Sequence, residues 1–463
     1  MDNQTTILNK SSISGVGIHT GVKTLLNFIP AEKNTGIIFI RTDIKERPII
    51  EADVDNVFST NRSTNLKKNN VEIYTVEHVL AAIQGCGIAN LIIEINNIEV
   101  PIMDGSSRLF SKILRESGIK FLDAKLPTYK ISKKISFKDE DSGTILTIEP
   151  SNKYEVEVEI DYNSKKLGIQ KASLSDMSNF EDEISSSRTF CFLHELEELI
   201  SRNLIKGGDI NNAIVIVEKD ITQEKLDKLA KVFNKKNIKV GKENILDNLE
   251  LRYDNEPARH KLLDVIGDLS LIGMAIQGKI TAIKPGHKNN TKFAKKLKEI
   301  ITEEMKKIAP NIDFNTKPLY NKEKIKKILP HRDPFLFIDE VRELGKDYII
   351  GTKFVSAEEE YFKGHFPGEP VMPGVLQLET MAQVGGILVL NTVENPEDYL
   401  TFFMKIDNAR FKQKVVPGDV IIFRLNLISP IRRGLCHMHG KGFVNSKIAV
   451  EADLLAQIVP KNK

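Results

Sequence analysis

Two short segments of the sequence combine histidine and carboxylate side chains in patterns that could hold a metal ion. Glu77 and His78 stand side by side, and Thr75 just before them is a candidate N-cap of a short helix. His260 and Asp264 are four residues apart in a stretch with helical spacing, so they share one helix face. Two histidines and an aspartate beside a glutamate have the composition of a catalytic zinc site, in which one position stays open for water.

A further histidine, His287, follows Lys284-Pro-Gly286 on an expected turn after a strand. A histidine on such a turn would be free to act as an acid. Each piece alone has a simpler interpretation, because a His–Asp pair on a helix is more often a surface pair than a metal site. Only the combination predicts a zinc hydrolase.

A second set of reactive groups lies beyond residue 320. His365 stands in the loop sequence GHFPG, and Glu379 lies on a strong helix pattern that begins at Gly374. The first N–H groups of a helix have no partner inside it, so that of Gly374 could polarise a carbonyl. A histidine, a glutamate and such a donor suffice to remove a proton next to a carbonyl and to expel a β-hydroxyl. Taken alone, His365 would be a loop residue and Glu379 a buried carboxylate with a local partner.

The elements that must position the first set are short and alternate in type. The expected strands are 24–29, 36–41, 90–95, 143–149, 154–160, 212–218 and 278–284, and the expected helices are 76–84, 109–117, 193–203, 257–272 and 291–307. The order of strands followed by helices occurs twice, which predicts two similar α+β subdomains, residues 1–126 and 127–305.

The boundary to the second set is predicted at residues 306–320, which contain two prolines and little periodicity and which we expect to be a linker. The remaining domain, residues 321–463, has one apolar helix pattern, Gly374–Leu390. The strands expected around it are 348–355, 399–411, 419–428 and 434–446. One helix among antiparallel strands predicts a sheet wrapped around that helix.

Composition excludes several classes of protein. Lys+Arg of 66 against Asp+Glu of 63 leaves a net charge of +3, which is too small to indicate a nucleic-acid binder. The three cysteines are far apart, so neither a disulfide framework nor a cysteine-based zinc site is expected. The first ten residues lack the apolar stretch of a signal peptide, and no run of about 18 apolar residues could span a membrane. We therefore expect a cytoplasmic protein of several domains.

The motifs around the first set resemble one family. TVEHVLAAI, NNIEVPIMDGSS, SSRTFCF, RHKLLDVIGDL and KPGH occur in the order and spacing of UDP-3-O-acyl-N-acetylglucosamine deacetylase, the zinc amidase that commits bacteria to lipid A synthesis. The similarity extends over roughly residues 1–305 and includes GVGIHTG near the N-terminus. It implies Zn2+ as the cofactor and a UDP-sugar carrying a 3-hydroxyacyl chain as the substrate.

The resemblance also implies a role for each matching residue. The zinc ligands would be His78, His260 and Asp264, and Glu77 would be the base that activates water. His287, oriented by Asp268, would be the acid. The residues implied around the substrate are Thr189 beside the oxyanion, Lys261 at the nucleotide diphosphate and Phe190 near the sugar.

The C-terminal domain resembles the 3-hydroxyacyl-acyl-carrier-protein dehydratases of the hotdog fold, through GHFPG, MPGVLQLETMAQ and the segment ARFKQKVVPGD. This resemblance implies an acyl-carrier-protein partner and a homodimer, commonly assembled as three dimers. His365 of one subunit would face Glu379 of the next. His365 would take the Cα proton, Glu379 would protonate the departing hydroxyl, and Gly374 would bind the substrate carbonyl.

The leading hypothesis is a fused enzyme with both activities, without a membrane span and in contact with the inner-membrane surface where its lipid-bearing sugar lies. One alternative is that one half is a non-catalytic binding or scaffolding module. The absence of any lost catalytic residue argues against it. A nearer alternative is an enzyme of different specificity, such as a hotdog thioesterase or another zinc amidase, which the double motif match disfavours.

Overall fold

The computed structural model describes residues 3–196, 212–219, 221–233, 235, 237–241, 244–246, 249–305 and 308–461. The chain forms two compact units, Met1–Ile301 and Thr302–Lys463. The division lies within helix α7 (His287–Met305), slightly before the boundary expected after residue 305. The finer boundaries 1–126, 127–305, 306–320 and 321–463 remain a proposal.

The first half of unit 1 is built on a five-stranded sheet with α-helices packed beside it. The strand order is β2 (Ser11–Val16), β3 (Lys23–Pro30), β9 (Leu91–Ile95), β4 (Ile37–Arg41) and β5 (Ile49–Glu51). Strands β4 and β9 run parallel and the other neighbours antiparallel. Helix α1 (Glu77–Gly85) is buried along almost its whole length and packs on α2 (Arg108–Glu116), which agrees with the apolar run that follows Glu77 and His78.

The second half repeats this design around another mixed sheet. The strand order is β12 (Ile135–Asp139), β13 (Thr144–Glu149), β18 (Ala275–Ile283), β14 (Tyr154–Ile160) and β15 (Gln170–Leu174), with β11 (Thr128–Lys130) also paired to β18. Strands β14 and β18 form a central parallel pair, as β4 and β9 do in the first sheet. Helix α6 (Glu256–Ser270) packs on β14 and β15.

Helices α1 and α6 join the two halves. A Cβ atom added to Gly267 on α6 would lie only 2.2 Å from the carbonyl oxygen of Glu77 on α1. Because no side chain fits there, glycine allows the two helix backbones to approach closely. This contact places the reactive residues of both halves next to each other.

Shorter elements complete unit 1. They are β1 (Asn3–Ile7) paired with β10 (Ile119–Lys125); β6 (Val57–Ser59), β7 (Asn65–Lys68) and β8 (Val71–Ile73); α3 (Phe180–Glu183); β16 (Phe190–Phe192) paired with β17 (Ile214–Ile216); and α5 (Gln223–Val232). No helix in the described part of the chain is long and apolar enough to cross a membrane.

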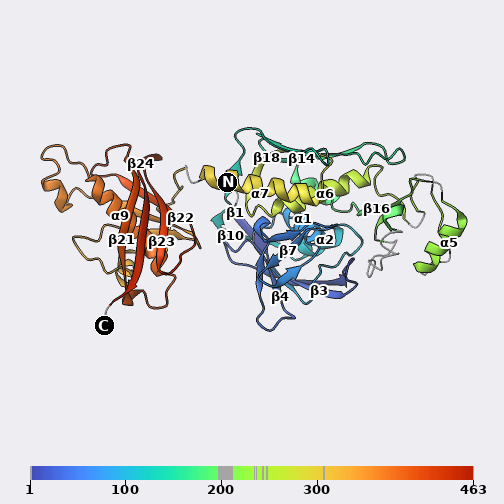
Figure 1. Ribbon diagram of the computed structural model, residues 1–463, viewed down its shortest axis with the longest axis horizontal. Coiled ribbons are helices and arrows are strands. Elements are labelled where there is room, and N and C mark those ends of the chain that lie inside the picture. The colour runs from blue at the N-terminus through green and yellow to red at the C-terminus, as the bar shows by residue number, and fades with distance from the viewer. Residues whose placement is uncertain are drawn as a thin grey trace. The chain divides into compact units, whose positions relative to one another are not determined.

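Unit 2 is an antiparallel sheet wrapped around one helix, as predicted. Helix α9 spans Gly374–Leu390 and contacts β20 through β24. Figure 1 shows α9 beside the long strands of this sheet. The strand order is β19 (Glu340–Leu344), β20 (Tyr348–Phe354), β22 (Val420–Leu427), β23 (Leu435–Val444), β24 (Lys447–Pro460) and β21 (Tyr399–Phe411); a short helix, α8 (Lys322–Ile328), precedes them. A Cβ at Gly385 would lie 2.8 Å from the side chain of Met438, so this glycine allows the helix to pack closely on the sheet.

Four local expectations need correction. Thr75 is not the N-cap of α1: Val76 occupies that position, and Thr75 has a φ of 62° and donates its hydroxyl to Glu99. His287 is the first residue of α7 and does not stand on a turn. Strand 212–218 is shortened to β17, and the expected strands did not include several that the structure shows, β19 and β24 among them. Of the expected helix 193–203, residues 197–203 lie outside the described residues.

Candidate functional site

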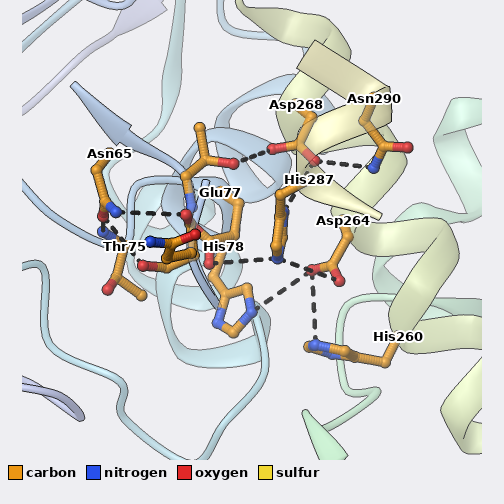
Figure 2. A network of polar contacts seen from close by, with 12 residues as sticks. Asn65, Thr75, Glu77, His78, His260, Asp264, Asp268, His287 and Asn290 are labelled. Carbon is orange, nitrogen blue, oxygen red and sulfur yellow. Dashed lines mark hydrogen bonds and ion pairs between the residues drawn. The ribbon is translucent and has the colours of Figure 1, made fainter. Parts of the chain in front are cut away.

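The predicted metal ligands converge in unit 1. His78 lies on α1 and His260 and Asp264 on α6; all are buried, and one ligand atom of each lies within 4.8 Å of the others. Nε2 of His78 is 3.7 Å and Nε2 of His260 is 3.5 Å from Oδ1 of Asp264 (Figure 2). These distances are too long for hydrogen bonds. They suit donors that share an ion, because two atoms held at about 2.1 Å from a tetrahedral ion lie about 3.4 Å apart.

The surroundings of these three side chains also fit a metal ion. Oδ1 of Asp264, which faces Nε2 of both histidines, is buried and has no hydrogen-bond partner among the described residues. Nδ1 of His260 lies 3.1 Å from the carbonyl oxygen of Ser187, which turns Nε2 toward Asp264. Burial and the neighbouring His260 lower the pKa of His78 to about 3, so its imidazole is neutral and can coordinate. The triad can therefore hold a metal.

Glu77 begins α1 beside this triad and is 2% exposed. Its Oε2 accepts a hydrogen bond from the N–H of Thr64 at 3.0 Å, and its Oε1 lies 3.9 Å from Nε2 of His287. Burial raises the pKa of Glu77 to about 7, although the charge of His287 opposes the rise. A carboxyl group with a pKa near 7 can take and return a proton at neutral pH.

His287 faces the same point from the start of α7. Its Nδ1 lies 2.9 Å from Oδ2 of Asp268, and its Nε2 lies 3.8 Å from Oδ2 of Asp264. Burial disfavours the charged ring, but the carboxylates of Asp268, Asp264 and Glu77 outweigh it and raise the pKa of His287 to about 9. Figure 2 shows Asp268 between His287 and Asn290, whose amide donates to Asp268 at 2.9 Å. The raised pKa keeps the His287 ring protonated at neutral pH, and the contact with Asp268 sets its orientation.

The other predicted residues of this site line a cavity of about 290 Å3 next to the triad. The N–H of Thr189 donates to the carbonyl of Gly105 at 2.8 Å. The ring of Phe190 lies edge-on to that of His260, with 6.4 Å between centroids, and the ammonium of Lys261 lies 5.7 Å from the Phe190 centroid. Lys261 also donates to Oδ2 of Asp264 at 2.7 Å. The residues predicted for the first site therefore surround one cavity, except Asp268, which lies behind His287 and contacts its Nδ1.

In unit 2, Glu379 lies on α9 at a second, largely apolar cavity of about 350 Å3. Its Oε1 accepts a hydrogen bond from Nε2 of Gln383 at 3.0 Å, and Nε2 of His331 lies 3.6 Å away. Gly374 begins the same helix, and no side chain caps its first turn, which leaves N–H groups for a ligand. A Cβ at Gly374 would lie 2.7 Å from the ring of Phe411, so a side chain there would displace this ring.

His365 has the geometry of a base but stands apart from Glu379. Its Nδ1 lies 2.8 Å from the carbonyl oxygen of Val371, and donation of this N–H leaves the lone pair on Nε2. His365 does not line the cavity beside Glu379, and within the described part of the chain no hydrogen bond or ion pair joins the two. Within one chain, His365 and Glu379 therefore do not form the pair that the sequence motifs suggested.

Comparison with known proteins identifies both units. Residues 4–231 and 227–299 match the model of the LpxC family, UDP-3-O-acyl N-acetylglycosamine deacetylase, and residues 329–453 match the FabA-like domain. Proteins described as bifunctional enzyme LpxC/FabZ are similar over 99% of both chains, with 47% identity in Bacteroides thetaiotaomicron and 44% in Porphyromonas gingivalis. The chain belongs to the bifunctional LpxC/FabZ family. A UDP-3-O-acyl-N-acetylglucosamine deacetylase from Teredinibacter turnerae is 35% identical and matches 67% of this chain and 97% of its own length.

The LpxC/FabZ relationship confirms the predicted fold class and the two enzyme activities, a deacetylase followed by a hotdog dehydratase. Sequence reasoning missed residues that hold the reactive groups. In the LpxC unit these are Asn290 and Thr64, whose hydroxyl donates to Asp268 at 2.5 Å. In the FabA-like unit they are His331 and Gln383, which contact Glu379. His331 stands in the conspicuous motif LPHRDPFLFID, and this was the one available signal.

Proposed function

We propose that the LpxC unit hydrolyses the acetamide of UDP-3-O-(3-hydroxyacyl)-N-acetylglucosamine with Zn2+, the committed step of lipid A biosynthesis, in the cytoplasm. The observation that carries the proposal is the buried triad of His78, His260 and Asp264, which faces both Glu77 and His287. Two imidazoles and one carboxylate are a donor set that zinc favours in catalytic sites. Zinc held there would lower the pKa of water and polarise the amide carbonyl.

The residues of the chain supply the proton transfers. Glu77, whose Oε1 is turned toward His287, takes the proton of the attacking water. His287, held by Asp268, gives the proton on its Nε2 to the departing amine as the C–N bond breaks. Water and amide thus become acetic acid, which ionises to acetate, and a free amine. The proton that Glu77 took replaces, through water, the one that His287 gave, and Thr189 supports the oxyanion that forms on the way.

The cavity beside the triad suits the rest of the substrate. Lys261 uses one of its three N–H donors on Asp264, which leaves two for the nucleotide diphosphate. Phe190 offers an aromatic ring for the sugar at the wall of the same cavity. Contact with the inner-membrane surface would deliver the acyl chain that this substrate carries.

We propose that the FabA-like unit dehydrates (3R)-3-hydroxyacyl chains on acyl carrier protein to trans-2-enoyl chains, a step of fatty acid biosynthesis. Nε2 of His365 takes the Cα proton, and the N–H of Gly374 at the start of α9 polarises the thioester carbonyl. Glu379 protonates the hydroxyl that leaves Cβ, so that water and a double bond form. The largely apolar cavity next to Glu379 suits the acyl chain.

The separation of His365 from Glu379 supports a dimer with shared sites. Strand β21 forms an edge of the sheet and exposes Phe402, Phe403 and Met404. An exposed apolar edge strand favours pairing with a second chain. We propose that a second copy supplies His365 to Glu379, and that three such dimers assemble.

The test is to assay both activities of the full chain before and after chelation. Deacetylation should be lost with the bound metal and return when zinc is added, whereas dehydration should persist, because none of its residues belongs to the triad. Circular dichroism before and after chelation checks that the fold is retained. Loss of both activities with the fold intact would contradict two independent sites. A protein without deacetylase activity even when loaded with zinc would contradict the proposed reaction.

A further inference from the structure

Thr64 uses all its polar groups inside the LpxC-type site. Its N–H donates to Oε2 of Glu77 at 3.0 Å, and its carbonyl accepts from the N–H of Val76 at 3.1 Å. Its hydroxyl donates to Oδ1 of Asp268 at 2.5 Å. The residue is completely buried, so water does not compete for these bonds. Thr64 therefore ties the start of α1 to α6.

The contacts of Asp268 show what the hydroxyl does. Oδ2 of Asp268 lies 2.9 Å from both Nδ1 of His287 and Nδ2 of Asn290. Its other oxygen, Oδ1, accepts the hydroxyl of Thr64. With both oxygens held, the carboxylate cannot rotate about its axis, and the direction of the His287 ring is fixed with it.

The same residue orients the base. Because Oε2 of Glu77 is held by the N–H of Thr64, Oε1 is the oxygen turned toward Nε2 of His287. Glu77 and Asp268 belong to helices that touch at Gly267, where the backbone of Glu77 leaves no room for a side chain. Helix packing and Thr64 thus fix the base and the acid with respect to each other.

We propose that Thr64 is a positioning residue that holds the base Glu77 and, through Asp268, the acid His287 in one rigid frame. This inference rests on the proposed deacetylation. The backbone N–H of Thr64 binds the base Glu77 and remains after any substitution except proline. The hydroxyl binds Asp268, which orients the acid His287, and a substitution can remove it. Replacement of the hydroxyl therefore tests the acid side alone.

The experiment compares Thr64→Val, which removes the hydroxyl at nearly constant volume, with Thr64→Ser, which keeps it, in the full chain. We expect kcat for deacetylation to fall about 10- to 100-fold in the valine variant, with KM changed less than about threefold. The serine variant should stay close to wild type, and all three proteins should bind one zinc per chain. An unchanged kcat in the valine variant, or an equal loss in the serine variant, would overturn the proposal. Loss of zinc from the valine variant would also overturn it, because Thr64 would then support the ligands.

A double-mutant cycle separates positioning from general structural support. If Thr64 acts through Asp268, Thr64→Val should cause little further loss of kcat in an Asp268→Asn background. If the double variant lost kcat by the product of the two single losses, the proposal would be contradicted. Thr64→Ala, which removes the hydroxyl without adding a methyl beside Asp268, gives the same cycle should the valine variant not fold. A wild-type chain without deacetylase activity would contradict the proposed function. An active wild-type chain with an equally active valine variant would leave the proposed function in place and contradict only the role of Thr64.

Discussion

Oε1 of Glu77 and Nε2 of His287 lie 3.9 Å apart, and each residue is the first of its helix, α1 and α7 respectively. The two groups assigned to proton transfer are therefore fixed by two helix starts from different halves of unit 1. Neither depends on a long loop for its position. The site needs only small movements to pass a proton between water, base, acid and amine.

Replacing Asp268 with Asn should shift the pH above which the rate of deacetylation falls to a lower value. His287 acts as an acid while it is protonated, so activity falls as the pH rises through its pKa of about 9. The Asp268 carboxylate helps to raise that pKa, and its neutralisation must lower it. The measurement is kcat against pH. Asp176→Asn, at an exposed residue paired with Lys153, is the matched control and should leave the profile in place.

His287→Ala should reduce kcat for deacetylation by about 10²- to 10⁴-fold while zinc stays bound, because His287 is assigned as the acid and not as a ligand. Metal analysis of the purified variant, together with the rate, checks this. His194→Ala removes a histidine whose side chain is 66% exposed and should change neither quantity. A His287→Ala protein that lacks zinc would show that the assignment is wrong.

Mixing inactive His365→Ala chains with inactive Glu379→Gln chains should restore dehydration. Random exchange gives mixed dimers in half of the population, and each mixed dimer has one intact His–Glu pair, so recovery should approach about one quarter of the wild-type rate. Subunit exchange is followed by native mass spectrometry. No recovery after proven exchange would mean that each site forms within one chain.

Gly105→Ala should destabilise the LpxC unit and reduce deacetylation. Gly105 has a φ of 84°, and a Cβ there would lie 1.9 Å from the carbonyl oxygen of Asn212. The carbonyl oxygen of Gly105 accepts a hydrogen bond from the N–H of Thr189. Gly36→Ala is the matched control, since Gly36 has a φ of 67° and open space around its Cβ direction. We expect Gly36→Ala to lower the free energy of unfolding by about 1–2 kcal/mol, because of the backbone conformation alone. Gly105→Ala should lower it by about 1–3 kcal/mol more, because of the steric clash. Equal thermal unfolding of the two variants would contradict this account.

The sequence motifs indicated candidate reactive residues and one supporting residue, Asp268, but they did not indicate the supporting residues Thr64 and Asn290. His78, His260 and Asp264 carry metal-binding atoms in recognisable spacing, and the motif around each is specific. Thr64 has no such chemistry, and the two carboxylates that it contacts are 13 and 204 residues away in the chain. A hydroxyl becomes informative only when the fold shows which carboxylate it touches. The assignment of individual roles to the site residues therefore stays a prediction for the kinetic experiments above.

Helix boundaries show the same limit. The apolar run of α9 was predicted to the residue, because Pro373 and Asn391 flank a stretch that is buried nearly all round. Thr75 looked like a helix cap by residue type alone, but buried Glu99 takes its hydroxyl instead. Tertiary contacts of this kind override local preference, and a single sequence does not show them.

Helix α7 begins at His287 and is 19 residues long, ending at Met305. A straight helix of that length measures roughly 28 Å. The last turn of α7 is therefore separated from the reactive imidazole by almost the full length of one helix. A substitution on the exposed face of that last turn should leave the orientation of the imidazole unchanged, because the first turn of the helix fixes it through Asp268.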